Sequence, residues 1–262
     1  MLSGVNGNSL HSSVLGADRS LSKSIEKIAS GKKINKASDD PAGSAMLSAM
    51  EAQSRGLVQM MANQQSQASV LQTASDSLST TSSMLQSINN LSLQASNGTL
   101  TKSDRAMIQN QISQLMTQIN MSSNQTQFNG QNLLDGTFNT TLPDGAAFSI
   151  PSMSADALGL SGISVETQGQ AMNASALAQS AIGAVSSLQG SLGAALNGIN
   201  SSISSLSSQY MNAISAGSQI GDVDMAQAIM DMTTAQIQSK ASLSVFKMND
   251  DTRSRVLDLL AD

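Results

Sequence analysis

The feature that most constrains this chain is a long stretch, residues 45–96, with no proline and a single glycine, Gly56. Apolar residues recur along it in heptads, which is the pattern of a narrow helical seam. A helix of roughly 50 residues would be about 75 Å long, because each residue adds about 1.5 Å. Such a rod is too long for a compact globule, so the stretch predicts a helical bundle or a larger assembly.

Each end of the chain carries a further helical stripe of apolar residues, one up to Gly31 and one after Gly221. Neither stripe adjoins in sequence an element that would cover it. We therefore expect the two ends to pair with each other and to be ordered against neighbouring copies of the chain. The residues predicted for this self-assembly surface are Leu10, Val14, Leu21, Ile25, Ile28, Met225, Ile229, Met232, Leu243, Phe246, Val256, Leu257, Leu259 and Leu260.

Charge and helix breakers are concentrated in residues 32–44, between two predicted helices. Lysines lie just beyond one helix C-terminus and Asp39 and Asp40 lie at the next N-terminus, where the helix dipole favours these charges. Pro41 suits the first turn of the second helix. The segment therefore reads as a charged joint. A solvated loop explains the charges equally well, but it does not explain the two flanking stripes.

The remaining segments predict a third helix from about Thr101 or Ser103, a hairpin region at 128–170 and a fourth helix from about 170 to 215. The hairpin is indicated by two β-favouring runs around the turn at residues 143–145. Four glycines lie inside the fourth helix, and each costs up to about 1 kcal/mol relative to alanine. That helix therefore needs close packing partners.

The composition argues against several classes of function. The net charge is −5 and charged residues are only 12% of the chain, so we expect no nucleic-acid binding. A weakly charged surface gives weak electrostatic repulsion between copies of the chain. Of the two interpretations, a self-associating protein is therefore favoured over a soluble protein that merely has few charges. The first ten residues lack a secretory signal pattern, and no apolar run is long enough for membrane insertion.

No arrangement of residues indicates catalysis, a cofactor or a metal. There are no cysteines and one histidine, His11, which excludes the HExxH and Cys/His zinc patterns. The adjacent Asp39 and Asp40 are better explained as helix caps, as are Asp222 and Asp224. The sixteen methionines lie mostly in the stripes and are expected to fill the core. We expect the protein not to be an enzyme.

Five short segments at both ends and in the middle of the chain carry recognisable motifs. They read SGKKINKASDDPAGSAM at 30–46, NQTQFNGQNLLDG at 124–136, MSADALGL at 153–160, IGDVDMAQAIMDMTTAQI at 220–237 and VLDLL at 256–260. In this order and at this spacing they resemble the signatures of bacterial flagellins. The signature residues are Ser30, Gly31, Ile34, Asn35, Asp39, Asp40, Ala42, Gly43, Phe128, Asn129, Gly130, Leu133, Leu134, Asp222 and Asp224.

The resemblance implies a mainly α fold, a long antiparallel helical bundle or coiled coil with a small β-hairpin region. Residues 45–215 would form this outer core, with the hairpin region at 128–170. The terminal helices, 1–31 and 216–262, would pair into a coaxial inner core beyond the joint at 32–44. Because the fourth helix follows MSADALGL closely, the chain is similar to a minimal flagellin without large inserted outer domains.

The resemblance also implies a function: a structural subunit that polymerises into the helical flagellar filament used for motility. The protein would be secreted through the flagellar type III apparatus and would be extracellular. Its partners would be other copies of itself in a homopolymer, an export chaperone, the filament cap and hook-associated junction proteins. No cofactor is implied.

Three other kinds of protein could carry part of this sequence pattern. A hook-filament junction protein of the same export system would share the core sequence, but the small size and the C-terminal signature favour the filament. An enzyme on a flagellin scaffold would need an inserted catalytic domain, for which the residues around the hairpin leave no room. A secreted coiled-coil translocator would need membrane-active apolar segments, and the sequence has none.

One departure from the family concerns innate-immune recognition. Flagellins recognised by the innate-immune receptor carry a Leu-Gln-Arg-Val-Arg-Glu-Leu motif in the long helix. Residues 85–91 read LQSINNL in this chain. A glutamate expected on the next helix is Gln111. A receptor site built on ionic contacts would lose them, so we expect weak or absent activation. We refer to Ser87, Asn90 and Gln111 as the receptor positions.

Overall fold

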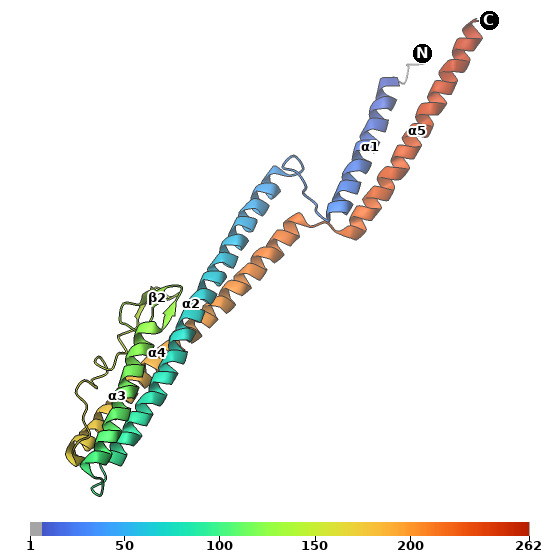
Figure 1. Cartoon of the computed structure of the whole chain (residues 1–262). Coiled ribbons are helices and arrows are strands. Elements are labelled where there is room, and N and C mark those ends of the chain that lie inside the picture. Colours follow the sequence, from blue (N-terminus) through green and yellow to red (C-terminus); the bar gives the residue numbers. More distant parts are fainter. Residues whose placement is uncertain (1–6, 262) are drawn as a thin grey trace. The chain divides into compact units, whose positions relative to one another are not determined.

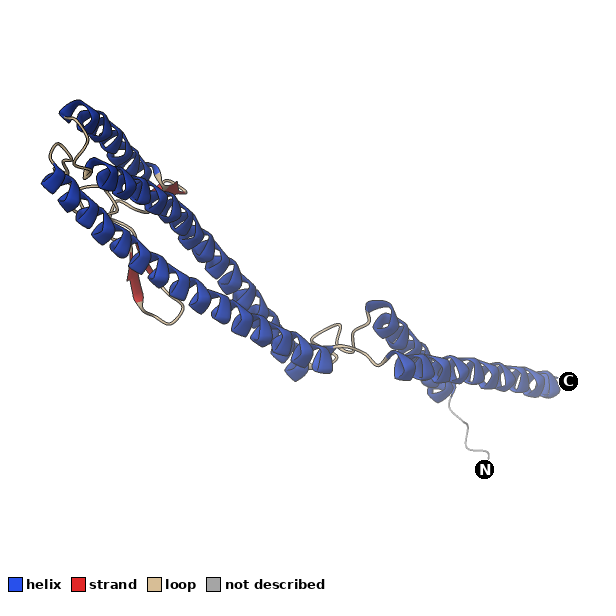
Figure 2. Cartoon of the chain, turned by 90° about the horizontal axis from the view of Figure 1, so that it is seen from below, coloured by secondary structure: helices blue, strands red, loops and turns tan. Residues whose placement is uncertain are grey.

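The computed structural model describes residues 7–261, with side chains described within 11–252 and at 254 and 255. Its helices are α1 (Gly7–Ser30), α2 (Pro41–Ala95), α3 (Lys102–Gln125), α4 (Gln168–Gly221) and α5 (Met225–Ala261). The strands are β1 (Gln127–Phe128), β2 (Gln131–Asn132), β3 (Asn139–Thr141) and β4 (Ala147–Ser149). The mainly helical architecture with a small β region is confirmed (Figures 1 and 2).

The chain forms two compact units. One spans residues 57–208, and the other combines the described parts of 1–56 and 209–262. The first unit holds most of α2, all of α3, most of α4 and the strands. The second holds α1, α5, the joint and the adjoining ends of α2 and α4. The finer division predicted at residues 31, 44 and 215 stays a prediction.

The core of the first unit is a seam between α2, α3 and α4. Leu78, Leu85 and Ile88 of α2 are fully buried, as are Ile112 of α3 and Leu192 of α4. These side chains recur at helical spacing, so each helix presents one apolar face inward. Buried alanines alternate with the larger residues along α4. The close packing predicted from its glycines is wrong at those positions, because a Cβ at Gly183, Gly190, Gly193 or Gly198 would meet nothing within 4 Å. Ala74 and Ala95 in α2 and Ala171 and Ala178 in α4 are among the alanines with 0% exposure in this core.

The hydroxyl groups on α2 are satisfied within the helix. Ser69, Thr73, Thr80 and Ser83 each donate to the backbone carbonyl four residues earlier, at 2.9–3.2 Å. Such back-bonding is a local alternative to contacts with water or with other elements. These serine and threonine hydroxyl groups therefore donate their hydrogen bonds within the helix itself.

Two small antiparallel pieces lie between α3 and α4, where the sequence predicted one hairpin. The expected one pairs β3 with β4 in the register Thr140 to Phe148. The second pairs β1 with β2 across Asn129 and Gly130, both of which have positive φ (50° and 80°). An Asn-Gly pair is the residue choice for a type I′ turn, so this second hairpin was readable from the sequence and was missed.

The boundaries agree with the prediction at the start of the second helix and differ at the end of the fourth. The second helix begins at Pro41, as the capping pattern predicted, and Asp40 caps it by accepting a hydrogen bond from the Gly43 amide at 3.0 Å. The fourth helix continues beyond Ser215 to Gly221. Packing of its end against Leu47 of α2 outweighs the poor helix propensity of Gly217 and Gly221. Thr101 caps α3 through a capping box with Asp104.

Candidate self-assembly surface

Helices α1 and α5 lie side by side and run antiparallel (Figure 1). Two cross-contacts define their register. The Ser239 hydroxyl donates to the Asp18 carboxylate at 2.7 Å, and the rings of His11 and Phe246 have centroids 6.3 Å apart. Residue numbers fall along one helix as they rise along the other, which confirms the predicted pairing of the two chain ends.

The face of α5 that packs on α1 is built largely from small residues. It follows a regular heptad spacing, which is the pattern of a two-helix seam. Ala228 and Ala235 are buried, while Ser239, Ser242 and Phe246 are half-buried. On α1 the matching face is also heptad-spaced, and it consists of Val14, Ala17, Leu21, Ser24 and Ile28, of which Ala17 is buried and the others half-buried.

Large apolar side chains occupy the other sides of α5, and none of the described residues covers them. Most exposed are Ile237 (63%) and Met248 (64%), with Met230 at 57%. These three recur on the side of the helix opposite the seam. We call the full set the outer face of α5: Met225, Ile229, Met230, Ile237, Leu243, Val245 and Met248.

The predicted assembly residues divide between the seam and the outer face. Val14, Leu21, Ile28, Met232 and Phe246 are half-buried in the pair of helices. Ile25, Met225, Ile229 and Leu243 are instead exposed on it. The predictions for Leu10, Val256, Leu257, Leu259 and Leu260 fall outside the described side chains.

Sequence reasoning missed the small seam residues of α5. Ala228, Ala235, Ser239 and Ser242 carry too little apolar character to stand out against the serine-rich background. A signal was nevertheless present, because they continue the heptad spacing that passes through Met232 and Phe246. Reading by spacing rather than by hydrophobicity would have separated the seam from the outer face.

The predicted joint is a folded element in which the two chain segments pair. The Lys33 amide donates to the Gly221 carbonyl at 2.6 Å, and the Val223 amide donates to the Gly31 carbonyl at 3.0 Å. Gly31 has φ 69°, the left-handed conformation that ends a helix and favours glycine. Ile34 is buried beside Gly43. The joint is therefore tied to the start of both α2 and α5.

Most of the signature residues at the joint act as caps and turn formers. Asp39 accepts from the Lys36 amide at 3.1 Å and the Asn35 amide at 3.3 Å. These bonds, the Lys36 amide first, hold the pKa of the Asp39 carboxyl below its ordinary value of 3.8. Asp224 caps α5 by accepting from the Ala226 amide at 2.9 Å. Ala42 is exposed in the first turn of α2.

Two further signature residues, which flank the joint, also form hydrogen bonds there. The Ser30 hydroxyl accepts from the Lys32 amide at 3.2 Å, and Asp222 accepts from the Ser218 hydroxyl. A hydrogen bond and the charge of Glu26, 2.8 Å away, raise the pKa of the Lys36 amine. The polar signature residues thus fix the local backbone.

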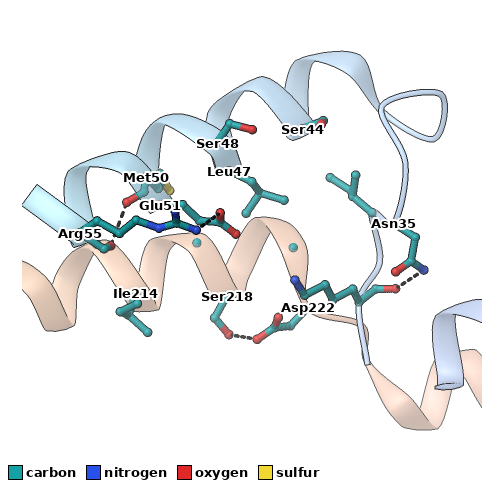
Figure 3. Close-up of a pocket in the computed structure, with 16 residues that line it drawn as sticks. Asn35, Ser44, Leu47, Ser48, Met50, Glu51, Arg55, Ile214, Ser218 and Asp222 are labelled. Carbon is teal, nitrogen blue, oxygen red and sulfur yellow. Dashed lines mark hydrogen bonds and ion pairs between the residues drawn. The ribbon is translucent and has the colours of Figure 1, made fainter. Parts of the chain in front are cut away.

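A pocket of about 440 Å³ lies beside the joint, between the start of α2 and the end of α4 (Figure 3). Its walls combine apolar side chains such as Leu47, Met50 and Ile214 with Asn35 and Asp222. Arg55 at its rim pairs with Glu51 at 3.7 Å. Within the lining, the Ser218 hydroxyl donates to the Asp222 carboxylate.

The middle signature is structural. Leu133 and Leu134 are fully buried, and Phe128, Asn129 and Gly130 form the first hairpin. The receptor positions, by contrast, are all exposed on α2 and α3. Within the described part of the chain, no three His, Cys, Asp or Glu side chains are placed to hold a metal ion. None of the described helices is long and apolar enough to cross a bilayer.

These features define a class: an elongated-helix structural protein whose terminal helices pair and leave a large apolar face uncovered. Comparison with known proteins specifies the family. The model of the bacterial flagellin N-terminal helical region matches residues 4–140, and that of the flagellin C-terminal helical region matches residues 175–260. The chain therefore belongs to the bacterial flagellin family, and it is a structural subunit of the flagellar filament.

Relatives match along nearly their whole length. The flagellin of Bacillus subtilis (strain 168) is 35% identical over 279 residues, covering 91% of this chain and 92% of that protein. The flagellin of Halalkalibacterium halodurans is 36% identical over 247 residues, covering 91% of both. Flagellin FlaB2 of Treponema pallidum is 32% identical, covering 92% of both. A minimal flagellin without a large inserted domain is thereby confirmed.

Solved structures support the fold. The crystal structure of Bacillus cereus flagellin is 23% identical with a TM-score of 0.50, covering 60% of this chain and 94% of that one. A Vibrio parahaemolyticus chain described as a flagellar hook-associated protein is 16% identical with a TM-score of 0.60, covering 70% and 100%. Filament and junction proteins thus share this fold. The high sequence coverage by flagellins favours the filament subunit over the junction protein.

Proposed function

We propose that this chain polymerises through the outer face of α5, together with exposed residues of α1 such as Ile25. The observation that carries the proposal is the distribution of apolar residues around α5. One side packs on α1, and the remaining sides still expose Ile237, Met230 and Leu243. A contiguous set of exposed apolar side chains marks an interaction surface. Neighbouring copies of the same pair of helices would supply that cover.

The weak charge of the chain supports the same conclusion. Between residues 232 and 249 of α5, Lys240 and Lys247 are the charged residues, and they are separated by uncharged positions. Few like charges would therefore face each other when copies stack. Under this proposal the paired α1 and α5 form the inner core of a homopolymer, as the family resemblance implied.

The proposal also covers the location of the polymer, the export route, the absence of catalysis and the further partners. The polymer is extracellular, the chain leaves the cell by the flagellar type III route, and it performs no catalysis. An export chaperone, the filament cap and hook-associated junction proteins are its further partners. The support for these statements is family membership, together with the finding that no group of described His, Cys, Asp and Glu side chains could hold a metal ion.

The test compares two substitutions at one exposed position. Ile237→Asn removes apolar surface from the outer face, and Ile237→Leu keeps it. Burying a side chain of this size is worth about 1.5–3 kcal/mol, so Asn raises the critical concentration for filament growth by about 10- to 150-fold. Leu leaves it within about threefold. Growth is followed by sedimentation and electron microscopy of seeded protein.

Because Ile237 is 63% exposed in the single chain, neither variant changes the thermal unfolding of the unit at 57–208. Filament growth by Ile237→Asn at the parent's concentration would refute the assignment of this face to assembly.

A further inference from the structure

The outer face of α5 contains an unusual number of methionines. Met230 and Met248 are 57% and 64% exposed and lie on the side opposite α1, while Met225 is 45% exposed at the start of the helix. A buried methionine is ordinary core filler, as Met153 is here at 5%. An exposed thioether is instead open to oxidants dissolved in water.

Apart from its methionines, the chain offers oxidants few side chains to react with. It has no cysteine and no tryptophan, and only one tyrosine. Thiols would otherwise be the first groups to react with a peroxide. In this chain, which has no thiols, the exposed methionines are the first groups to react with a peroxide.

We propose that Met230 and Met248 are reversible oxidation sites that control whether the chain can assemble. This proposal rests on the assignment of the outer face of α5 to assembly. Each thioether sulfur takes one oxygen atom from a peroxide: R–S–CH₃ and H₂O₂ give R–S(=O)–CH₃ and H₂O. The sulfur is oxidised, the peroxide is reduced, and the product side chain is polar and chiral.

The consequence follows from where these side chains would lie in a polymer. In the free chain they are exposed, so oxidation costs the fold nothing. In the assembled state they would be buried between copies, where a sulfoxide oxygen without a hydrogen-bond donor is unfavourable. Oxidation therefore acts on unassembled chains, and burial protects chains already in the polymer. Reduction of the sulfoxides restores assembly.

The first measurement maps oxidation in the free chain. The purified protein is treated with limiting hydrogen peroxide, and each methionine is quantified by peptide mass spectrometry. Met230 and Met248 oxidise about tenfold faster than the buried Met153, in line with their exposed fractions. In grown filaments the same two sites oxidise more slowly than in the free chain. Equal rates at Met153 and at these sites would overturn the proposal.

The second measurement links the sulfoxides to assembly. After peroxide, the critical concentration of the parent rises about tenfold or more, and treatment with both methionine sulfoxide reductases returns it to its starting value. The double variant Met230→Leu with Met248→Leu grows normally and keeps growing after peroxide, because leucine conserves volume and apolar character.

A matched double variant controls for oxidation elsewhere. Met107 and Met121 of α3 are equally exposed, at 58% and 52%. Met107→Leu with Met121→Leu stays as sensitive to peroxide as the parent. Resistance in this variant, continued sensitivity in the α5 variant, or unimpaired growth of the oxidised parent would each refute the oxidation sites while leaving the assembly face intact. A parent that cannot grow before treatment overturns the assembly face, and the oxidation proposal with it.

Discussion

A single methyl group at Gly43 is expected to open the joint. Glycine at this position lies in the first turn of α2, with Ile34 seated directly against it. A Cβ built there would lie 2.5 Å from Ile34 Cδ1 and 2.6 Å from an Asp40 carboxylate oxygen. Both distances are far below van der Waals contact. Gly43→Ala therefore requires the Cδ1 methyl of Ile34 and the Asp40 carboxylate to shift, and its cost is largest where Ile34 leaves its site and Asp40 loses the amide that it caps.

The magnitude follows from the contacts that are lost. Loss of the Asp40 cap costs about 1 kcal/mol, and exposure of the buried Ile34 side chain costs about 1.5–3 kcal/mol. Alanine recovers about 1 kcal/mol through its better helix propensity. The net loss is about 1.5–3 kcal/mol. It acts on the local opening of the joint rather than on the bundle at 57–208.

Amide hydrogen exchange measures this opening directly. The amides of Lys33 and Val223 bond across the joint, and their exchange rates follow the free energy of local opening. Gly43→Ala should raise both rates by about 10- to 150-fold. Gly56→Ala in the same helix is the control, since its Cβ would meet open space, and it should leave both amides unchanged. Rates within twofold of the parent in Gly43→Ala would show that Ile34 does not hold the joint closed.

Three further outcomes are expected. Hydrogen bonds from Thr101, its hydroxyl first and then its amide, lower the pKa of Asp104 from 3.8, so the stability that this cap gives α3 is full above that pH and is lost as the pH falls through the lowered value. Amide exchange at the start of α3 should speed up only in this acid range, and Asp104→Asn should abolish the dependence. Leu78→Ala empties a fully buried site and should lower the free energy of unfolding in urea by about 2–5 kcal/mol, whereas Leu93→Ala, at a site 51% exposed, should change it far less. The uncharged receptor positions should give weak or absent activation in a reporter-cell assay, and potency equal to that of an enterobacterial flagellin would contradict this.

The long helices were predictable because their signal is physical and repeated. Heptad spacing through Leu71, Leu78 and Leu85 continues for many turns without proline, and each of these residues is buried as expected. Capping residues such as Thr101 and Asp224 also follow local rules that hold without tertiary context. The exact ends were less accessible. Packing of Gly221 against Leu47 extends α4 past two glycines, and propensity alone cannot anticipate such a contact.

The pairing of the two terminal helices was predicted, but the side of α5 that takes part in it was not. Apolar residues marked both terminal helices, yet the sequence alone could not say which side of α5 would face α1. The seam uses Ala235 and Ser239, whereas Ile237 and Leu243 point away. A prediction based on hydrophobicity places the largest apolar residues of α5 in the contact with α1. Here the small residues take that partner, because they permit close approach of the helices.

The hydroxyl groups of α2 that bond to their own helix have a consequence for the conditions in which this protein works. Cohesion here depends on apolar contact and on internal donor–acceptor pairs. Ion pairs such as Lys36–Glu26 and Arg55–Glu51 lie open to water and contribute little. Dissolved ions consequently have few attractions to weaken. Subunits built in this way should keep the same fold in fresh water and in brine.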